Sequence, residues 1–153
     1  YDFSDNRFDS HSLLDIVKVV EKEKILFKPD IIFTHNSSNL NIDHQLTFQA
    51  VITAARPMSD EIVKSIICFE TPSATEWQAA SNANRFSPNL YIGISKEDLD
   101  AKINALNSYV FECRDYPHPR SAEALTVLAK YRGYSAGLCL AEAFQVIRHI
   151  MPD

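Results

Sequence analysis

Glycine is scarce in this sequence: Gly93, Gly133 and Gly137 are the only three among 153 residues. That is about 2% of the chain, whereas about 7% is usual in proteins. Phosphate-binding loops of the Walker and dinucleotide-binding types need several glycines within a few residues, because backbone amides must come close to the phosphates. No window of the sequence supplies them, so these two classes of nucleotide-binding protein are excluded.

Cysteine is also sparse, with Cys68, Cys113 and Cys139 far apart and without a C-x-x-C pair. An odd number at such spacings argues against a disulfide framework and against a cysteine-based zinc knuckle. The simplest interpretation is a reducing, cytoplasmic compartment. The sequence begins at Tyr1 and shows no charged-then-apolar signal segment, so we interpret it as an internal fragment.

Runs of basic residues and long apolar segments are both missing. The chain has 15 Lys and Arg against 20 Asp and Glu, with a net charge of −5. It therefore lacks the positive charge that non-specific binding to nucleic acids or anionic membranes requires, and neither partner is expected. Its apolar stretches are far shorter than the roughly 18 to 20 residues of a membrane-spanning helix, so no membrane span is predicted.

What the sequence does contain is an alternation of helical and extended patterns. The run Ile31, Ile32, Phe33 is apolar on both faces, which is typical of a central parallel strand covered by helices on each side. The order of elements predicts a single α/β domain over residues 1–153, built on a parallel sheet between helices. Strands are expected over 30–34, 65–70 and 89–94, and helices from residue 10 or 12 to about 28, then over 43–55, 96–108, 121–132 and 136–149.

Two further patterns are predicted to be structural. Gly133 and Gly137 favour turning and close packing over ligand binding. The last predicted helix has an apolar face that we expect to lie in the core, formed by Leu138, Leu140, Phe144 and Ile147. Five aromatic residues fit either the core or a contact between copies in a homo-oligomer, namely Tyr109, Phe111, Tyr116, Tyr131 and Tyr134.

The segment from His35 to His44 follows a predicted strand and is rich in groups that can bind a ligand. In open parallel sheets, ligands bind beyond the carboxyl ends of the strands. His44 is preceded by Asp43, which is a reasonable pairing of a metal ligand with a carboxylate that orients it. The alternative is that Asp43 caps the following helix and that His35 and His44 are ordinary loop residues.

Several segments together resemble the LmbE-like or PIG-L-type zinc-dependent N-deacetylase family, which also includes GlcNAc de-N-acetylases. The main one is KPDIIFTHNSSNLNIDHQLTFQAVITAARP, residues 28–57, where a strand and a polar loop lead to an Asn-x-Asp-His element before a helix. Residues 5–9 (DNRFD), residues 117–121 (PHPRS) and the glycine-containing end of the chain also fit, in the right order. The resemblance implies a Rossmann-like α/β sandwich and hydrolysis of an N-acetyl group from an amino sugar.

The resemblance also implies roles for particular residues. His44 becomes a ligand of Zn²⁺, Asp43 its orienting neighbour, and Arg7 a substrate-binding residue. For Arg7, the alternative is a surface ion pair with Asp5 or Asp9. His118 lies between two prolines, and it is either a polar or acid group of the site or a plain loop histidine.

The sequence departs from the family at two points. The His-Pro-Asp-Asp-Glu element that follows the family's first strand is absent, so the first strand, two zinc ligands and the general base are missing from this chain. Some members also carry a histidine three residues before the metal-binding one, where it stabilises an oxyanion. This chain has Asn41 there, which can donate a hydrogen bond but cannot carry a positive charge.

The predicted function is therefore a zinc-dependent hydrolase that releases acetate from an N-acetylated amino sugar or glycoconjugate, once the missing segment is supplied. The polar stretch over 71–88 is a candidate cover for such a substrate. Its Trp77 either packs on a sugar ring or anchors the core. The stretch also contains Glu76, Asn82, Asn84 and Arg85. The alternative is a non-catalytic carbohydrate-binding or assembly module with the same fold. A further alternative is a different metal hydrolase that acts on phosphate esters or other amides.

Overall fold

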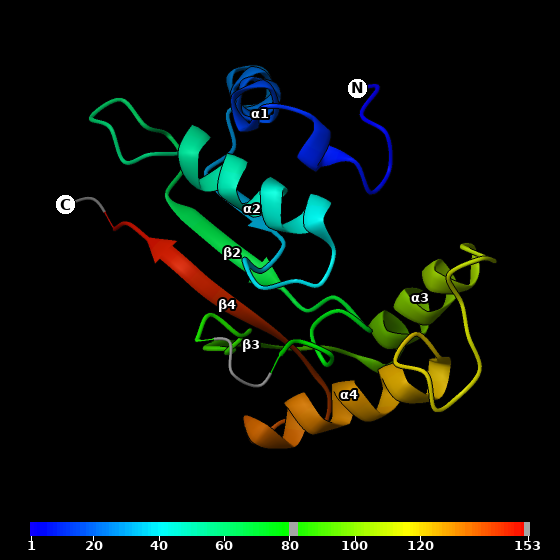
Figure 1. Cartoon of the computed structure of the whole chain (residues 1–153). Helices are drawn as coiled ribbons and strands as arrows, with labels where there is room; N and C mark the ends of the chain where they lie inside the picture. The colour runs from blue at the N-terminus through cyan, green and yellow to red at the C-terminus, as the bar shows by residue number, and fades with distance from the viewer. Residues whose placement is uncertain (80–82, 152–153) are drawn as a thin grey trace. The chain divides into compact units, whose positions relative to one another are not determined.

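The computed structural model describes residues 1–79 and 83–151 of the chain (Figure 1). Asn82, which we placed in the substrate-covering loop, lies outside the described residues. The elements are, in chain order, a short 3-10 helix η1 (Phe8–Ser10), α1 (Leu13–Phe27), β1 (Ile31–Thr34), α2 (Ile42–Ala54), β2 (Ser65–Phe69), β3 (Leu90–Gly93), α3 (Lys96–Asn107), α4 (Ala122–Ser135) and β4 (Ala141–His149).

The chain forms an α/β fold with a mixed sheet in the strand order β1-β2-β4-β3. β1 and β2 are parallel, with Ile32 opposite Ile66, whereas β3 and β4 are antiparallel, with Leu90 opposite Phe144. The α/β class is thus confirmed, and parallel pairing is present between β1 and β2. The chain divides into two compact units, Tyr1–Ser87 with Gln145–Asp153 (unit 1) and Pro88–Phe144 (unit 2).

Unit 1 is built from α1 and α2, which lie side by side, and from β1 and β2 (Figure 1). Ser12 caps α1 by accepting a hydrogen bond from the backbone of Asp15, as serine commonly does. Small side chains of α2 let it pack closely on α1, where Ile16 and Val17 meet Ala50 and Ala54. On another side of α2, Val51 and the C-cap residue Ala55 pack in a second cluster with Val63 and with Ile66 of β2.

Within the described residues, β1 is not a central strand covered on both faces, contrary to the prediction. β1 lies at one end of the strand order, and Ile31 and Phe33 are 44% and 51% exposed. Ile32, which points to the other face, packs against the core of unit 1. An apolar pattern indicates that both faces of a strand favour burial, but it does not say which polypeptide covers them.

Unit 2 contains α3 and α4 together with β3 and the first half of β4. Ser95 and Asp98 form a capping box at the start of α3, and Ser121 caps α4. The helices predicted over 96–108 and 121–132 are confirmed. The five aromatic residues are exposed rather than in the core, including Phe111 at 88% and Tyr134 at 70%; an oligomer contact remains a prediction.

The predicted last helix over 136–149 is wrong, because residues 141–149 form β4. Gly137, with φ of +73°, follows the end of α4 and turns the chain, a conformation that glycine adopts readily. In β4 the buried side chains alternate, with Ala141 at 1% and Ala143 at 2% exposure, which is the period of a strand. Leu138 and Ile147, assigned to a buried helical face, are 42% and 37% exposed.

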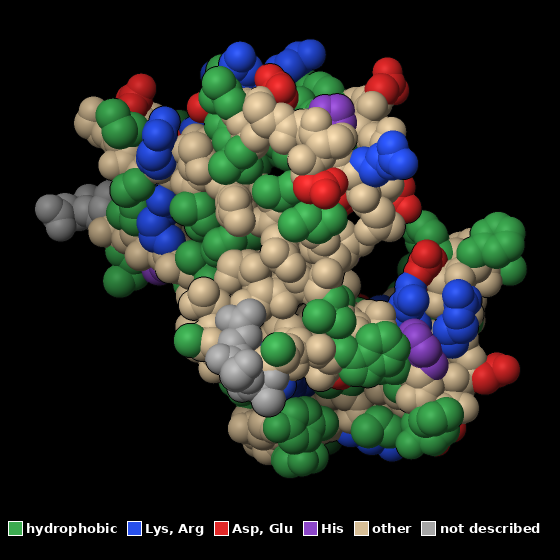
Figure 2. Space-filling model, in the orientation of Figure 1, with side chains coloured by type: hydrophobic (Ala, Val, Ile, Leu, Met, Phe, Trp, Pro, Cys, Tyr) green, Lys and Arg blue, Asp and Glu red, His purple; other side chains and the backbone are tan. Residues whose placement is uncertain are grey.

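Acidic and basic side chains are interspersed over the face of unit 1 drawn in Figure 2, in keeping with the small net charge of the chain. Within the described ranges, no helix combines the length and the apolar character needed to cross a membrane.

Candidate functional site

The loop between β1 and α2 carries the residues that the sequence singled out, and it lies wholly within unit 1. Asn41 caps α2, because its side-chain oxygen accepts a hydrogen bond from the backbone N–H of Asp43 at 2.8 Å. The alternative in which Asp43 is the cap is therefore wrong. Asp43 and His44 both lie in the first turn of α2, so the helix holds their backbone in place.

His44 is half-buried, and its Nδ1 lies 3.0 Å from Oδ1 of Asn39. Burial lowers the pKa of His44, and the charges of Asp43 and Asp5 act in the opposite direction with smaller effect. A lowered pKa favours the uncharged imidazole at neutral pH. A neutral imidazole is the form that binds metal ions, so the state of His44 suits the role of ligand.

A second histidine, His35, stacks on the ring of His44, with ring centroids 3.7 Å apart and planes 2° from parallel. Phe69 contacts the His35 ring edge to face, at 4.9 Å between centroids. Burial, followed by the neighbouring His44, lowers the pKa of His35 to about 4. Its Nδ1 is buried without a hydrogen-bond partner among the described residues.

The stacking geometry argues against His35 as a second ligand of an ion bound by His44. The lone pair of an imidazole nitrogen lies in the plane of its ring, and zinc sits about 2.0 to 2.1 Å from that nitrogen. An ion shared by two parallel rings, 3.7 Å apart, would have to lie well out of both planes. His35 instead limits rotation of the His44 ring.

Asp43 anchors the N-terminal segment that resembles the family's substrate-binding stretch. Its Oδ1 accepts a hydrogen bond from the backbone N–H of Phe8 at 2.9 Å, and the carboxylate is buried, at 7% exposure of the residue. Asn41 Nδ2 donates to Asn6 Oδ1 at 2.9 Å. Arg7, between these two anchored residues, is exposed, so the structure brings Arg7 and the start of α2 into one neighbourhood.

A network of three buried or partly buried amide side chains lies next to this loop, and sequence reasoning missed it. Oδ1 of Asn36 accepts from Nε2 of Gln78 at 2.9 Å, and its Nδ2 donates to Oε1 of Gln145 at 3.0 Å. Asn36 and Gln78 are 3% and 6% exposed. The network joins the loop after β1 to the segment over 71–88 and to β4. Amides far apart in the sequence give no signal of such pairing.

The segment over 71–88 carries Trp77, which is 53% exposed and so is not a core anchor. The neighbouring Gln78 is buried and also accepts from the backbone N–H of Phe86 at 2.9 Å. Gln78 therefore ties this segment together through Phe86, while more than half of the Trp77 surface is exposed.

His118 belongs to unit 2, whereas His44 belongs to unit 1. It is half-buried, and its Nδ1 accepts a hydrogen bond from the backbone N–H of Arg120 at 3.0 Å. Its role in a site remains a prediction.

A catalytic zinc ion needs three protein ligands. Among the described residues, no group of three or more His, Cys, Asp and Glu side chains is arranged to hold a metal ion. His44 is suited to supply one ligand, and the described residues alone do not supply the set.

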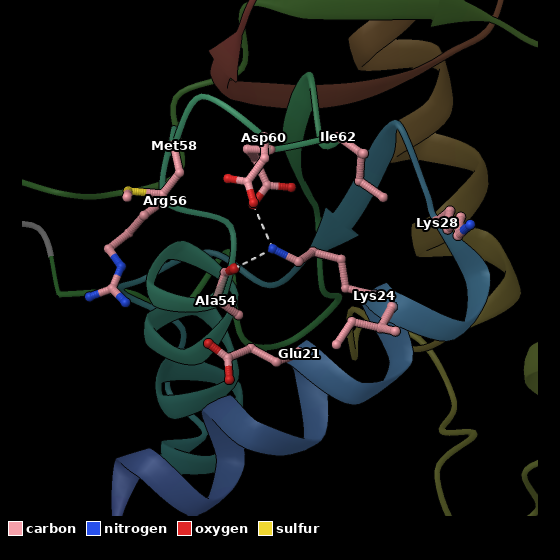
Figure 3. A pocket seen from close by; sticks show the side chains of 10 residues that line it. Glu21, Lys24, Lys28, Ala54, Arg56, Met58, Asp60 and Ile62 are labelled. Atoms are coloured by element: carbon pink, nitrogen blue, oxygen red, sulfur yellow. Dashed lines mark hydrogen bonds and ion pairs between the residues drawn. The ribbon is translucent and has the colours of Figure 1, made fainter.

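A separate hollow of about 540 Å³ lies at the other end of α2 (Figure 3). It surrounds Lys24, which donates to the Ala54 carbonyl and to Glu61, with Arg56 and Met58 at its border. Ten residues of helix separate His44 from Ala54, which is about 15 Å. The hollow is therefore not part of the His44 site.

Replacing Asn41 with alanine is expected to destabilise the chain by about 1 kcal/mol, because an N-cap hydrogen bond is lost. Urea unfolding followed by circular dichroism measures the change. Asn41→Ser, which keeps a capping oxygen, should lose much less, and equal losses in the two variants would contradict the capping role.

No family model matches the sequence, and no curated protein matches it. Solved structures do. The zinc-inhibited form of teicoplanin deacetylase Orf2 has a TM-score of 0.66 at 15% identity, over 99% of this chain and 57% of its own. N,N′-diacetylchitobiose deacetylase from Pyrococcus horikoshii has a TM-score of 0.61 at 16% identity, over 98% of this chain and 58% of its own.

A third similar structure is not a deacetylase by its description. GalB, the 4-carboxy-2-hydroxymuconate hydratase from Pseudomonas putida, has a TM-score of 0.60 at 18% identity, over 91% of this chain and 60% of its own. The chain thus spans about six tenths of the length of these proteins. The predicted resemblance is confirmed at the level of the fold: the chain has the α/β fold of LmbE/PIG-L-type deacetylases.

Proposed function

We propose that the chain is the His44-bearing part of a zinc-dependent N-deacetylase that acts on an N-acetylated amino sugar or glycoconjugate. The observation that carries the proposal is the position of His44, a half-buried imidazole in the first turn of α2, beyond the carboxyl end of β1; burial lowers its pKa, which favours the neutral form. Ligands bind at this position in parallel α/β sheets. The deacetylase fold of the chain supports the same reaction class.

The chain's own residues provide binding and orientation in this proposal. Arg7 is held beside α2 by its neighbours Asn6 and Phe8, so its exposed guanidinium is available for substrate hydroxyl or anionic groups. Trp77 offers an exposed aromatic face to a sugar ring. Asn41 keeps one N–H of its amide for an oxyanion, and His118 is a further proposed polar group. A bound zinc ion would polarise the acetamide carbonyl.

The remaining ligands are proposed to come from polypeptide outside this chain. β1 ends the strand order, so its outer edge can pair with a further strand. Its exposed Ile31 and Phe33 also offer an apolar sheet face to a covering element. Parallel strands end at the same edge of a sheet. A strand added in parallel to β1 would therefore end beside His35, close to the ring of His44.

Zinc content and affinity test this proposal. We would compare the 153-residue chain, a form extended by the residues encoded before Tyr1, and the extended form with His44→Ala. The extended form is expected to bind one zinc ion tightly and to release acetate from N-acetylated amino sugars, and His44→Ala to lose both properties. His11→Ala, at the end of η1, is the matched histidine control and should keep both.

A non-catalytic carbohydrate-binding module is the second candidate, favoured by the lack of a three-ligand group in the described part of the chain. If the extended form binds N-acetylated sugars but no zinc, this candidate replaces the first. Zinc binding that His44→Ala leaves unchanged would contradict the role proposed for His44.

A further inference from the structure

The contact between Asn39 and His44 fixes more than the position of the ring. Asn39 is 1% exposed and among the largest fully buried side chains of the structure. Its Oδ1 accepts a hydrogen bond from the backbone N–H of Asn41 at 3.1 Å and also lies 3.0 Å from Nδ1 of His44. One side-chain atom therefore faces two nitrogens.

The backbone N–H of Asn41 settles which atom of the Asn39 amide this is. A backbone N–H only donates, so the atom that faces it has to be the amide oxygen and not the NH₂ group. The same oxygen faces Nδ1 of His44 and can only accept there as well. Nδ1 of His44 must then carry the proton, and in a neutral imidazole the lone pair is left on Nε2.

Asn39 itself is held so that it cannot easily turn away. Its backbone N–H donates to the carbonyl of Asn36 at 3.1 Å, and its own carbonyl accepts from Nε2 of Gln45 at 2.6 Å. The ring of His35 covers one face of the His44 imidazole. These contacts limit the rotation of the His44 ring and keep its Nδ1 facing Asn39.

We propose that Asn39 is a positioning residue that holds His44 in the tautomer protonated at Nδ1, so that Nε2 is the ligand atom. The assignment of the tautomer stands on the contacts alone, and its use in metal binding rests on the proposed function. Hydrogen-bonding partners of this kind orient histidine ligands, and their loss typically costs about 10- to 100-fold in metal affinity.

The tautomer is measured on the metal-free 153-residue chain, labelled with ¹⁵N, by long-range ¹H–¹⁵N correlation of the histidine rings at about pH 8, above the usual histidine pKa. Signals of His44 are assigned by their loss in His44→Gln. His118 is an internal reference of the opposite kind, because its Nδ1 accepts from the Arg120 backbone and its proton is therefore on Nε2.

The expected result is that His44 carries its proton on Nδ1 in the unaltered chain and in Asn39→Asp, which keeps an acceptor. In Asn39→Leu, which fills the space without an acceptor, the proton should shift toward Nε2. The His118 signals should not change. A His44 proton on Nε2 in the unaltered chain, or a tautomer that Asn39→Leu does not alter, overturns the assignment.

If circular dichroism shows that Asn39→Leu does not fold, the smaller Asn39→Ala, which also lacks a side-chain acceptor, takes its place with the same expected shift. The tautomer of the unaltered chain is decided in either case. In the extended, zinc-binding form, Asn39→Leu is expected to lower zinc affinity about 10- to 100-fold, with Asn39→Asp retaining it. An unchanged affinity overturns the positioning role.

The two proposals fail separately. A His44 proton on Nδ1 together with no zinc binding by the extended form overturns the proposed function and leaves the tautomer assignment standing. Zinc binding through His44, together with a proton on Nε2 in the metal-free chain, overturns the tautomer assignment and leaves the proposed function standing.

Discussion

Replacing Lys24 with methionine is expected to destabilise the chain by about 3 to 5 kcal/mol, because it leaves a buried carboxylate without its cation. Lys24 Nζ forms an ion pair with Glu61 at 2.5 Å, and the two side chains are only 16% and 6% exposed. The same ammonium group donates to the carbonyl of Ala54 at 2.6 Å. One side chain thus joins α1, the end of α2 and the segment before β2 (Figure 3).

Loss of the hydrogen bond to the Ala54 carbonyl adds to the destabilisation caused by the unpaired Glu61 carboxylate. The last carbonyls of a helix have no partner within it and carry partial negative charge, which cations stabilise. The last turn of α2 contains no basic residue of its own, and Lys24 and Arg148 donate instead to the carbonyls of Ala54 and Ala55. Methionine keeps most of the apolar stem of lysine but none of this charge.

The pH dependence identifies the carboxylate as the origin of the loss. Burial would raise the pKa of Glu61, but the hydrogen bond from Lys24, the backbone hydrogen bonds and the charge of Lys24 outweigh it and lower the pKa. A lowered pKa contributes stability above the ordinary glutamate pKa, and this contribution is lost as the pH falls through the folded-state pKa. The difference between the unaltered chain and Lys24→Met should therefore shrink in acid.

Urea unfolding at neutral and acidic pH measures both effects. Lys96→Met is the matched control, because it removes an exposed pair with Asp100, whose side chains are 67% and 49% exposed, and it should change stability by less than about 0.5 kcal/mol. The double variant Lys24→Met with Glu61→Leu should recover much of the loss. A Lys24→Met loss as small as that of Lys96→Met would contradict the prediction.

The elements that local sequence could identify are those with strong end signals. α1 begins after the capping Ser12, and α2 and α3 end within a residue or two of their predicted ends. β4 had no such signal, since Leu138, Leu140, Phe144 and Ile147 also fit a helical spacing. Its partner β3 lies about 50 residues earlier in the chain, and pairing over that separation overrides local propensity.

The residues of the candidate site also fall into those that the sequence could indicate and those that it could not. The motif around Asp43 and His44 is found through the resemblance of residues 28–57 to a known family, since its spacing alone also fits a capped helix after a polar loop; the structure places both residues in one turn of helix. Asn39 and Gln78 could not be found in this way, because their importance comes from the atoms they face and not from their type. Asn39 matters through one oxygen opposite His44, and Gln78 through its bond to Asn36, 42 residues away.

Gly133→Ala is expected to destabilise the chain by about 1 to 3 kcal/mol, which is opposite in sign to the usual effect of this change in a helix. Alanine is ordinarily better than glycine inside a helix by about 1 kcal/mol. Gly133, however, is buried in α4, and a Cβ atom there would lie 2.8 Å from the carbonyl group of Cys139 and from the carbonyl oxygen of Leu138.

Those neighbours cannot move away without breaking other bonds. The backbone N–H of Leu138 donates to the carbonyl of Gly133 itself at 2.8 Å, and that of Ala136 donates to the same carbonyl at 2.9 Å. The turn that leads from α4 to β4 is thus tied to the residue that would push against it. A shift of this turn would also disturb Ala141, the first residue of β4 and 1% exposed.

Gly93→Ala is the matched control, because the nearest atom to its added Cβ is the end of the flexible Leu138 side chain at 3.5 Å, an ordinary contact distance. Its stability should therefore stay equal or rise slightly, since glycine weakens a strand. Thermal and urea unfolding of both variants measure the difference. If Gly133→Ala were as stable as Gly93→Ala, the close approach of the turn to α4 could not be the reason for glycine at position 133.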